Sequence, residues 1–295
     1  MTQFNFKAIG TMWQIDIYEN LQEAREAEIF SIIRNRIETF ESHYSRFRDE
    51  SIVTKISKVK VGDSTGDRTF VLPSDAEKMF NIYKYLYILT NGLFTPLIGG
   101  VLSDFGYDSK YSLQAKSEIE KAPTWDEVME YNYPKLLIKK PALLDFGAAG
   151  KGYIIDIIGE LFEENNINEY CIDAGGDIRH RNNNVIRVGL ENPEDTNQVI
   201  GVCELGNESI CGSAGNRRAW GTVNHIMNPK TLESSSEIIA VWVTAKNTML
   251  ADALTTCLFF VPASILTLHY QFEYILLRKD FSIEKSANFS GEFFS

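Results

Sequence analysis

The chain has 295 residues, which is enough for one large domain or two closely packed halves with a substantial core. Its hydrophobic fraction of 44% and charged fraction of 23% are typical of a globular protein. The net charge of −11 and the lack of a lysine or arginine run argue against a general nucleic-acid-binding protein.

The cysteines and the N-terminal sequence indicate the redox environment and cellular location of the protein. The four cysteines (Cys171, Cys203, Cys211 and Cys257) show no CxxC spacing, so we expect buried thiols and neither disulfides nor a zinc site. The first residues lack the basic and apolar regions of a signal peptide. No run of about eighteen apolar residues is present that would span a membrane. We therefore expect a cytoplasmic protein without a lipoprotein signal.

The N-terminal half predicts one strand and two long helices. Residues 12–18 alternate in polarity and are rich in aromatic residues, as in a strand. Residues 21–44 predict an amphipathic helix, because apolar residues recur on one stripe: Ile29, Ile33, Ile37, Phe40 and Tyr44. Residues 74–91 predict a second helix, at whose start Ser74 and Glu77 would form a capping box.

The C-terminal half mixes strands and helices. Residues 99–134 predict an irregular surface excursion, with a short strand that pairs into residues 135–140. Beyond it we expect helices at residues 149–164 and 249–260, strands at 169–173, 185–190 and 237–245, and a final strand at 272–277. Because these elements lack a regular βαβ repeat, the sequence predicts an α+β fold with largely antiparallel sheets flanked by helices.

Residues 144–153 hold the strongest chemical signal, since three glycines and two alanines surround Lys151 just before a predicted helix. Small residues allow close approach of the backbone to a ligand, a helix start attracts anions, and a lysine suits phosphate. The segment therefore predicts a phosphate cradle. It matches neither the Walker P-loop nor the GxGxxG pattern. Tight packing at a helix start is the alternative interpretation.

Asp252 and Thr256 are four residues apart, so both lie on one face of a predicted helix. A carboxylate and a hydroxyl in this arrangement form half of a site for a hard cation such as Mg²⁺. In the alternative interpretation, Asp252 caps a helix or forms a salt bridge, and Thr256 bonds to its own helix.

Three further segments carry polar or charged groups beside small residues. Residues 212–218 predict a small-residue loop for a planar ligand or a second phosphate, or a turn with solvated charges. Residues 173–177 predict a tight turn with two carboxylates that orients the cradle, binds a ligand hydroxyl, or only forms the turn. His225 lies among turn residues, where a general base could reach a substrate, although a single histidine can also be structural.

Eight segments in this order resemble the FAD:protein FMN transferases, the ApbE-like family. In this sequence they are residues 9–11, 45–47, 92–96, 145–156, 173–177, 212–213, 225–229 and 252–256. The resemblance covers most of the chain. It implies an ApbE-like fold, with residues 1–295 as one domain and a ligand cleft between two closely packed subdomains.

The resemblance also implies an activity, namely transfer of FMN from FAD to a Ser or Thr hydroxyl of an acceptor protein, with AMP leaving. Mg²⁺, or Mn²⁺ in its place, would be held by the Ala148 carbonyl, Asp252 and Thr256, and His225 would be the catalytic base. The residues implied to contact FAD are Thr11, Ser45, Leu93, Phe94, Thr95, Lys151, Asp173, Gly212 and Ser213. Thr95 stands where the family often has Asp, so we expect its contact with the adenosine side to differ.

Two other functions use the same residues. The site could hydrolyse FAD to FMN and AMP, with water in place of the acceptor. The chain could also bind flavin without catalysis, with Asp252 and Thr256 only bracing a helix. Tyr44, Phe94 and Trp220 are candidates for contact with the isoalloxazine ring and equally for the hydrophobic core.

Overall fold

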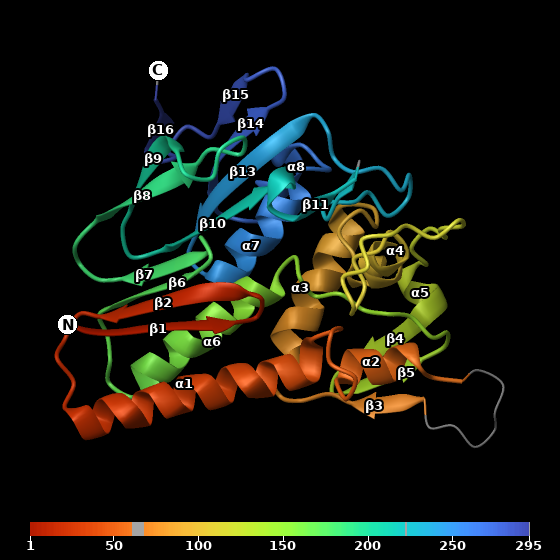
Figure 1. Cartoon of the computed structure of the whole chain (residues 1–295), viewed down its shortest axis with the longest axis horizontal. Coiled ribbons are helices and arrows are strands. Elements are labelled where there is room, and N and C mark those ends of the chain that lie inside the picture. Colours follow the sequence, from red (N-terminus) through yellow and green to blue (C-terminus); the bar gives the residue numbers. More distant parts are fainter. Residues whose placement is uncertain (61–67, 222, 295) are drawn as a thin grey trace. The chain divides into compact units, whose positions relative to one another are not determined.

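The computed structural model describes residues 1–60, 68–221 and 223–294 and divides into two compact units (Figure 1). Unit 1 comprises Met1–Thr39, Ala148–Arg218 and Ser236–Ser295, and unit 2 comprises Phe40–Gly147 and Ala219–Ser235. Unit 1 is thus built from three segments of chain that are far apart in the sequence. The ligand cleft between two subdomains stays a prediction.

Unit 1 is centred on an antiparallel sheet. Among its described residues this sheet has eight strands in the order β1-β2-β6-β7-β10-β13-β14-β15. Their bounds are β1 Thr2–Ala8, β2 Thr11–Ile17, β6 Tyr170–Ala174, β7 Ile178–Arg181, β10 Ser209–Ala214, β13 Ile238–Ala245, β14 Glu273–Arg278 and β15 Ile283–Lys285. Alternation places the side chains of successive residues on opposite faces of the sheet.

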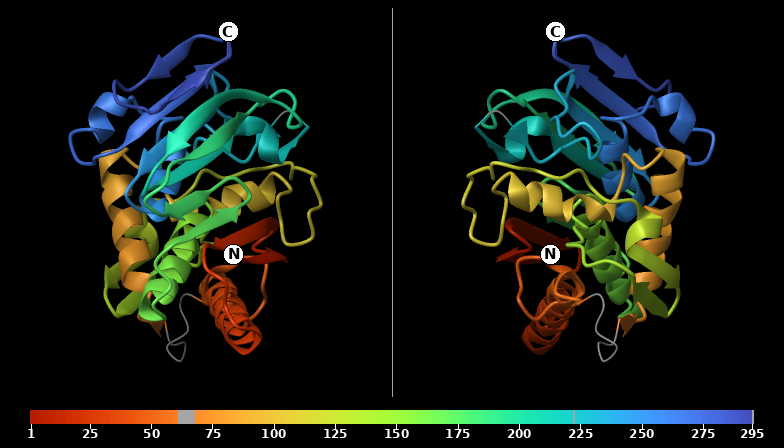
Figure 2. Two further views of the ribbon diagram at one scale, coloured as in Figure 1. Left: turned by 90° about the vertical axis from the view of Figure 1, so that its left-hand side faces the viewer. Right: turned by 90° about the vertical axis from the view of Figure 1, so that its right-hand side faces the viewer.

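Helices cover one face of this sheet. Helix α6 (Gly150–Glu164) packs on β6, β7 and α7, and α7 (Thr248–Cys257) packs on β10 and β13. Helix α1 (Glu23–Tyr44) lies along the β1–β2 hairpin in the views of Figures 1 and 2, and Phe30 stacks on Phe4 with ring centroids 5.1 Å apart. A short helix, α8 (Ala263–Leu266), follows α7.

The other face of the sheet forms a second core with a smaller antiparallel sheet. The order of this sheet is β16-β9-β8, formed by Gly291–Phe293, Val199–Leu205 and Ile186–Glu191. Leu190 and Leu205 from this sheet meet Ile210, Trp242 and Ile275 from the larger one. Burial of such apolar side chains stabilises the fold by roughly 1.5–3 kcal/mol per residue.

Unit 2 consists of short elements around an aromatic core. Tyr83 stacks on Phe94 with centroids 4.8 Å apart, and Phe146 packs edge-on against Tyr83 at 5.2 Å. The elements are α2 Ile52–Ser57, β3 Thr69–Val71, α3 Ala76–Leu89, η1 Pro96–Ile98, α4 Gly99–Asp104, α5 Trp125–Val128, β4 Met129–Asn132, β5 Lys135–Ile138, β11 Ala219–Trp220 and β12 Val223–Asn224. A further turn of helix, η2 (Gly215–Arg218), belongs to unit 1.

The predicted α+β class is confirmed, and so are the long helices. The stripe predicted for residues 21–44 is buried in α1. The capping box at Ser74 and Glu77 is wrong, because α3 begins after Asp75, whose carboxylate accepts a hydrogen bond from the Tyr44 hydroxyl. All four cysteines are free thiols.

Several strands were not predicted. The strands without a counterpart in the sequence analysis are β1, β3, β7, β9, β10, β11, β12, β15 and β16. The final strand predicted at residues 272–277 corresponds to β14 (Glu273–Arg278), which β15 and β16 follow. Residues 99–134, predicted as irregular, contain α4, α5 and β4. Most of these elements are short, and tertiary packing overrides weak local preference in such segments.

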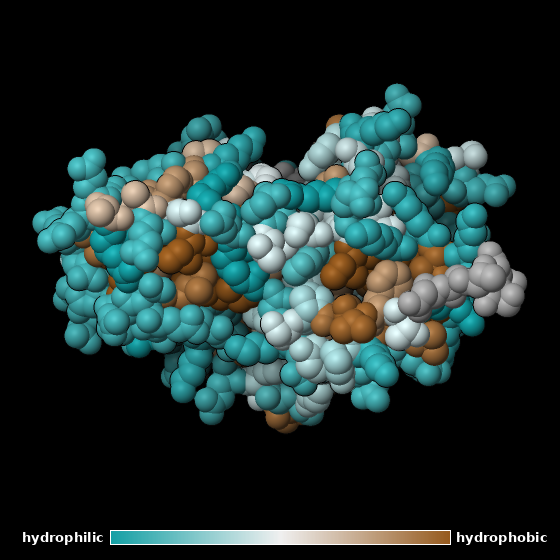
Figure 3. Space-filling view, turned by 90° about the horizontal axis from the view of Figure 1, so that it is seen from below, coloured by the Kyte–Doolittle hydropathy of each residue, from teal (hydrophilic) through white to brown (hydrophobic). Residues whose placement is uncertain are grey.

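Across the described residues, no helix is long and apolar enough to cross a membrane. The face drawn in Figure 3 is mainly hydrophilic, with hydrophobic side chains gathered in small patches between polar ones.

Candidate active site

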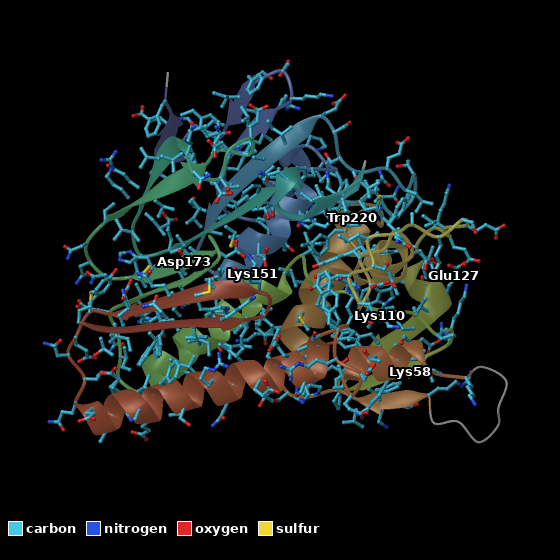
Figure 4. The ribbon with its side chains drawn as sticks, in the orientation of Figure 1. Lys58, Lys110, Glu127, Lys151, Asp173 and Trp220 are labelled. Atoms are coloured by element: carbon cyan, nitrogen blue, oxygen red, sulfur yellow. The ribbon has the colours of Figure 1, made fainter. Side chains whose placement is uncertain are left out.

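Lys151 lies in the first turn of α6 (Figure 4). Its ammonium forms an ion pair with Asp177 Oδ2. The Asp177 side chain is only 1% exposed, whereas that of Lys151 is 21% exposed. The Lys151 side chain therefore stays partly exposed to solvent, while the buried Asp177 carboxylate holds its ammonium in place.

The electrostatics of this pair hold Lys151 in its charged form. Burial by itself lowers the pKa of Lys151, but the negative charges of Asp177 and Asp252 outweigh it and raise the pKa above the usual value. A permanently charged ammonium at a helix start is suited to phosphate. Cys211, also near this pair, stays a thiol, because burial raises its pKa well above the usual value.

Asp252 joins α7 to the start of α6. Its Oδ2 accepts a hydrogen bond from the Gly152 amide at 2.9 Å, and the residue is 5% exposed. This close approach requires glycine, because a Cβ at Gly152 would lie 2.3 Å from the Thr248 carbonyl oxygen. The Gly152 amide is thus engaged by protein and does not point at a ligand.

Asp156, one turn further along α6, fixes the start of α7. Its two carboxylate oxygens accept hydrogen bonds from the amides of Thr248 at 2.9 Å and Met249 at 2.8 Å. Arg179 Nη1 also donates to Asp156, at 2.6 Å. Asp156 and Gly152 together hold α7 at two points, so they set where Asp252 lies.

Gly212 and Ser213 lie in strand β10, which corrects the prediction of a loop. The Gly212 amide is 3.4 Å from Asp177 Oδ1, and Ser213 Oγ is 2.8 Å from Thr255 Oγ1 on α7. Thr255 Oγ1 in turn donates to the Asp252 carbonyl at 2.6 Å. The hydroxyl bonded within its own helix is therefore that of Thr255, whereas Thr256 is partly exposed.

Asp173 and Thr11 lie beside the same hairpin. Asp173 Oδ1 accepts the Gly176 amide at 2.8 Å, which closes the turn after β6. A Cβ on Gly175, whose φ is +67°, would lie 2.1 Å from Thr11 Oγ1, so Thr11 packs directly on this turn. Of the two carboxylates predicted at residues 173–177, Asp173 shapes the turn and Asp177 orients Lys151.

In unit 2, Arg46 and Asp145 form a buried ion pair that sequence reasoning did not single out. Arg46 Nε donates to Asp145 Oδ2 at 2.5 Å, and the Arg46 guanidinium lies 4.3 Å from the Phe47 ring centroid. Asp145 Oδ1 accepts the Gly147 amide at 2.7 Å. The segment that precedes Ala148 is therefore fixed from within unit 2, next to Ser45, which is partly buried.

The three aromatic candidates for ring contact belong to the core of unit 2. Phe94 is 1% exposed, Tyr44 5% and Trp220 9%, and Trp220 Nε1 donates to the Phe105 carbonyl at 2.7 Å. Thr95 Oγ1 accepts the Leu97 amide at 3.2 Å and caps η1. Phe94 and Thr95 therefore pack and cap within unit 2, and their contact with FAD stays a prediction, as does that of partly buried Leu93, which precedes them.

His225 follows β12 in unit 2 on a braced turn. The Ile226 amide donates to Asn224 Oδ1 at 2.9 Å, which closes a turn around His225. Ser234 Oγ accepts the Asn224 amide at 2.8 Å and lies 3.1 Å from the Asn224 carbonyl, to which it donates. His225 is therefore half-buried and has a fixed backbone, and its Nδ1 atom is shielded from solvent.

The donor set in unit 1 fits a hard divalent cation. Asp252 and Thr256 are one turn apart on α7, and the close contact at Gly152 brings this part of α7 to the start of α6, just after Ala148. Mg²⁺ typically takes one or two carboxylates and completes its shell with water and phosphate oxygens. Within the described ranges, no group of three or more His, Cys, Asp or Glu residues could hold a metal, so a cage built from such side chains is not indicated.

Comparison with known proteins places the chain in a class of transferase enzymes, as predicted. Residues 9–272 match the model of the ApbE family, and the chain belongs to that family. The FAD:protein FMN transferase of Buchnera aphidicola subsp. Schizaphis graminum is 24% identical over 301 residues, covering 92% of this chain and 84% of that protein. The Escherichia coli K12 protein of the same name is 22% identical over 276 residues, covering 87% and 77%.

Solved structures show the same fold. The flavin transferase ApbE from Vibrio cholerae superposes with a TM-score of 0.78 at 18% identity, covering 97% of this chain and 96% of that one. The ApbE protein from Thermotoga maritima also gives a TM-score of 0.78 at 18% identity, with 97% of each chain covered.

Proposed function

We propose that this chain transfers FMN from FAD to a Ser or Thr hydroxyl of an acceptor protein and releases AMP. The names of its relatives support the substrate and the reaction. The observation that carries the proposal is the charged Lys151, held by Asp177 at the start of α6 and beside Asp252. This combination suits a pyrophosphate, whose cleavage develops negative charge on the leaving phosphate.

Lys151 and the α6–α7 contact form the pyrophosphate end of the proposed site. The Ala148 carbonyl, Asp252 and Thr256 would hold Mg²⁺, or Mn²⁺, which when bound neutralises phosphate charge. Because Asp156 and Gly152 fix α7 against α6, these donors need little rearrangement. Pre-organised groups of this kind supply most of the catalysis in phosphoryl transfer. The other proposed FAD contacts are Thr11, Ser45, Leu93, Phe94, Thr95, Asp173, Gly212 and Ser213.

His225 is proposed as the base for the acceptor hydroxyl. It takes the hydroxyl proton while the oxygen forms a bond to the phosphorus of the FMN moiety. The bond from that phosphorus to the bridging oxygen breaks, and AMP leaves with this oxygen and its electron pair. Such a base contributes typically 10²–10⁴-fold to the rate. The turn formed by Asn224 fixes the backbone at His225.

The test is a transfer assay with a defined acceptor. The chain is incubated with FAD, Mg²⁺ and a protein that carries an Asp-Gly-x-Ser/Thr-Gly-Ala sequence. We expect a fluorescent acceptor band that survives denaturation and one AMP per FMN transferred. Asp252→Asn should abolish both products, whereas Asp49→Asn, at an exposed carboxylate, should change neither.

Two outcomes would contradict the proposal. AMP released at the same rate with and without acceptor would indicate FAD hydrolysis. FAD binding without any product, unchanged in Asp252→Asn, would indicate a non-catalytic flavin-binding protein.

A further inference from the structure

Strand β10 extends past the hairpin that it pairs with. The ladder between β10 and β7 contains only Ser209 opposite Arg179 and Ile210 opposite Ile178. On the opposite edge, β10 pairs with β13 along its whole length, up to Ala214. Within the ranges that the structure describes, no strand pairs with β10 beyond Ile210 on the β7 side.

Backbone groups of β10 point to this open edge. The Gly212 amide lies 3.4 Å from Asp177 Oδ1, at the end of the hairpin, and so is directed away from β13. Ala214, two residues along, presents its amide and carbonyl to the same side, because directions alternate along a strand. Asn216 Nδ2, just beyond β10, donates to the Pro193 carbonyl and bounds the edge.

The two faces of β10 lead to different environments. Ser213 faces α7, where it bonds to Thr255, the residue before the proposed metal ligand Thr256. Ile210 and Ala214 face the other way, into the core shared with the smaller sheet. A segment added at the open edge would alternate in the same manner, with one side chain toward α7 and its neighbours toward that core.

A cavity of about 110 Å³ lies on the core side of this edge. Its walls include Ile178, Val188, Ile210, Ala214 and Trp242. Gly212 keeps it open, because a Cβ there would lie 2.9 Å from Trp242 Cδ1. A cavity of about 150 Å³ holds benzene, so this one is large enough for a side chain of a few heavy atoms.

We infer that the open edge of β10 binds the acceptor protein as a short added strand. This inference depends on the proposed transferase function and adds the acceptor's binding mode. The hydroxyl residue faces α7, beside the pyrophosphate end of the site, and a small neighbouring side chain enters the cavity. Hydrogen bonds to the Gly212 carbonyl and to the backbone of Ala214 supply affinity, and the cavity size supplies selectivity, as in other cases of strand addition.

The first test measures peptide binding without chemistry. A fluorescein-labelled peptide with the sequence Asp-Gly-Ala-Ala-Gly-Ala, which has no acceptor hydroxyl, is titrated into the FAD- and Mg²⁺-loaded protein. Fluorescence anisotropy should show binding to the wild type. N-methylation of the peptide backbone should weaken binding at least 10-fold at every second position only. Equal sensitivity at all positions, or no binding to the wild type, would overturn the inference.

The second test fills the cavity. Ala214→Leu should weaken peptide binding at least 10-fold and leave FAD affinity within 2-fold, whereas Ala287→Leu, at an exposed site in unit 1, should change neither. If Ala214→Leu does not fold, tryptophan in place of the residue before or after the reactive position of the peptide serves the same purpose. Peptide binding that is undiminished in Ala214→Leu, or for the tryptophan-substituted peptide, would overturn the inference.

The two proposals can fail separately. A wild type that binds the alanine peptide in the predicted manner, but transfers no FMN to its threonine counterpart, overturns the transferase function. Normal transfer with unchanged acceptor KM in Ala214→Leu overturns only the binding mode.

Discussion

Replacing Lys151 with methionine should leave the buried Asp177 carboxylate without its cation. Asp177 is 1% exposed, and among the described residues its carboxylate would keep the 3.4 Å contact with the Gly212 amide. Removal of one partner from a buried ion pair costs about 3–5 kcal/mol, because the remaining charge stays desolvated. Since the Lys151 side chain is 21% exposed, we expect the lower end, about 3 kcal/mol.

The double variant separates loss of charge from loss of packing. In Lys151→Met/Asp177→Asn no unpaired charge stays buried, so about half of the lost stability should return. For a chain of 295 residues, about 3 kcal/mol corresponds to a fall in Tm of about 5 °C. Thermal unfolding followed by circular dichroism, with chemical denaturation for the free energies, measures all four members of the cycle.

The pH dependence of the stability difference between wild type and Lys151→Met gives a second check. The pKa of Lys151 is raised, so its ion pair contributes fully below the usual lysine value of 10.5 and is lost only as pH rises through the higher, folded-state value. The stability difference between wild type and Lys151→Met should therefore stay constant from about pH 6 to 9. A difference below about 1 kcal/mol, or additive effects in the cycle, would refute the reasoning.

Three other predictions concern single residues. Gly152→Val should lower stability by about 2 kcal/mol and weaken Mg²⁺ binding, because its side chain would meet the Thr248 carbonyl; denaturation and calorimetry measure these effects. His225→Gln should reduce FMN transfer about 10²–10⁴-fold with unchanged FAD affinity, measured by flavin fluorescence. Burial, together with the charge of Asp173, raises the pKa of Cys171 to about 12, so this thiol should react with iodoacetamide at pH 8 far more slowly than free cysteine.

Each of these three predictions would be contradicted by a specific result. Normal metal affinity in Gly152→Val would show that the α6–α7 contact does not set the donors. Equal loss of FAD binding and transfer in His225→Gln would make this histidine a binding or structural residue. Rapid alkylation of Cys171 in the folded chain would contradict the burial of this thiol. The alkylation rate of the unfolded chain serves as the reference for an accessible thiol.

Periodicity was sufficient for the elements with one wide apolar stripe. The stripe from Ile29 to Tyr44 predicts α1, and the apolar residues after Lys151 predict α6. It failed for β10, since Gly212 and Ser213 look like loop residues. The glycine is needed because Trp242 of β13 lies over it, and that neighbour is distant in sequence.

The order of motifs located the segments of the site but not the partners within them. Two carboxylates, Asp173 and Asp177, flank one turn, and only the folded hairpin shows which of them meets Lys151. The partners of Asp156 could not be predicted either, because Thr248 and Met249 lie 92 and 93 residues away in the sequence. Hydrogen bonds over such distances depend on the packing of α6 against α7, which no local pattern encodes.

The interleaved construction of unit 1 has a consequence for synthesis of the chain on the ribosome. The β1–β2 hairpin emerges first, yet its sheet neighbour β6 follows roughly 150 residues later, a delay of roughly 10–30 s at typical elongation rates. Until then Trp13 and Ile15, buried in the finished sheet, have no β6 to pack beside. Closing a loop of roughly 150 residues costs about 4 kcal/mol of entropy. The nascent hairpin is therefore the segment for which we expect the longest dependence on chaperones.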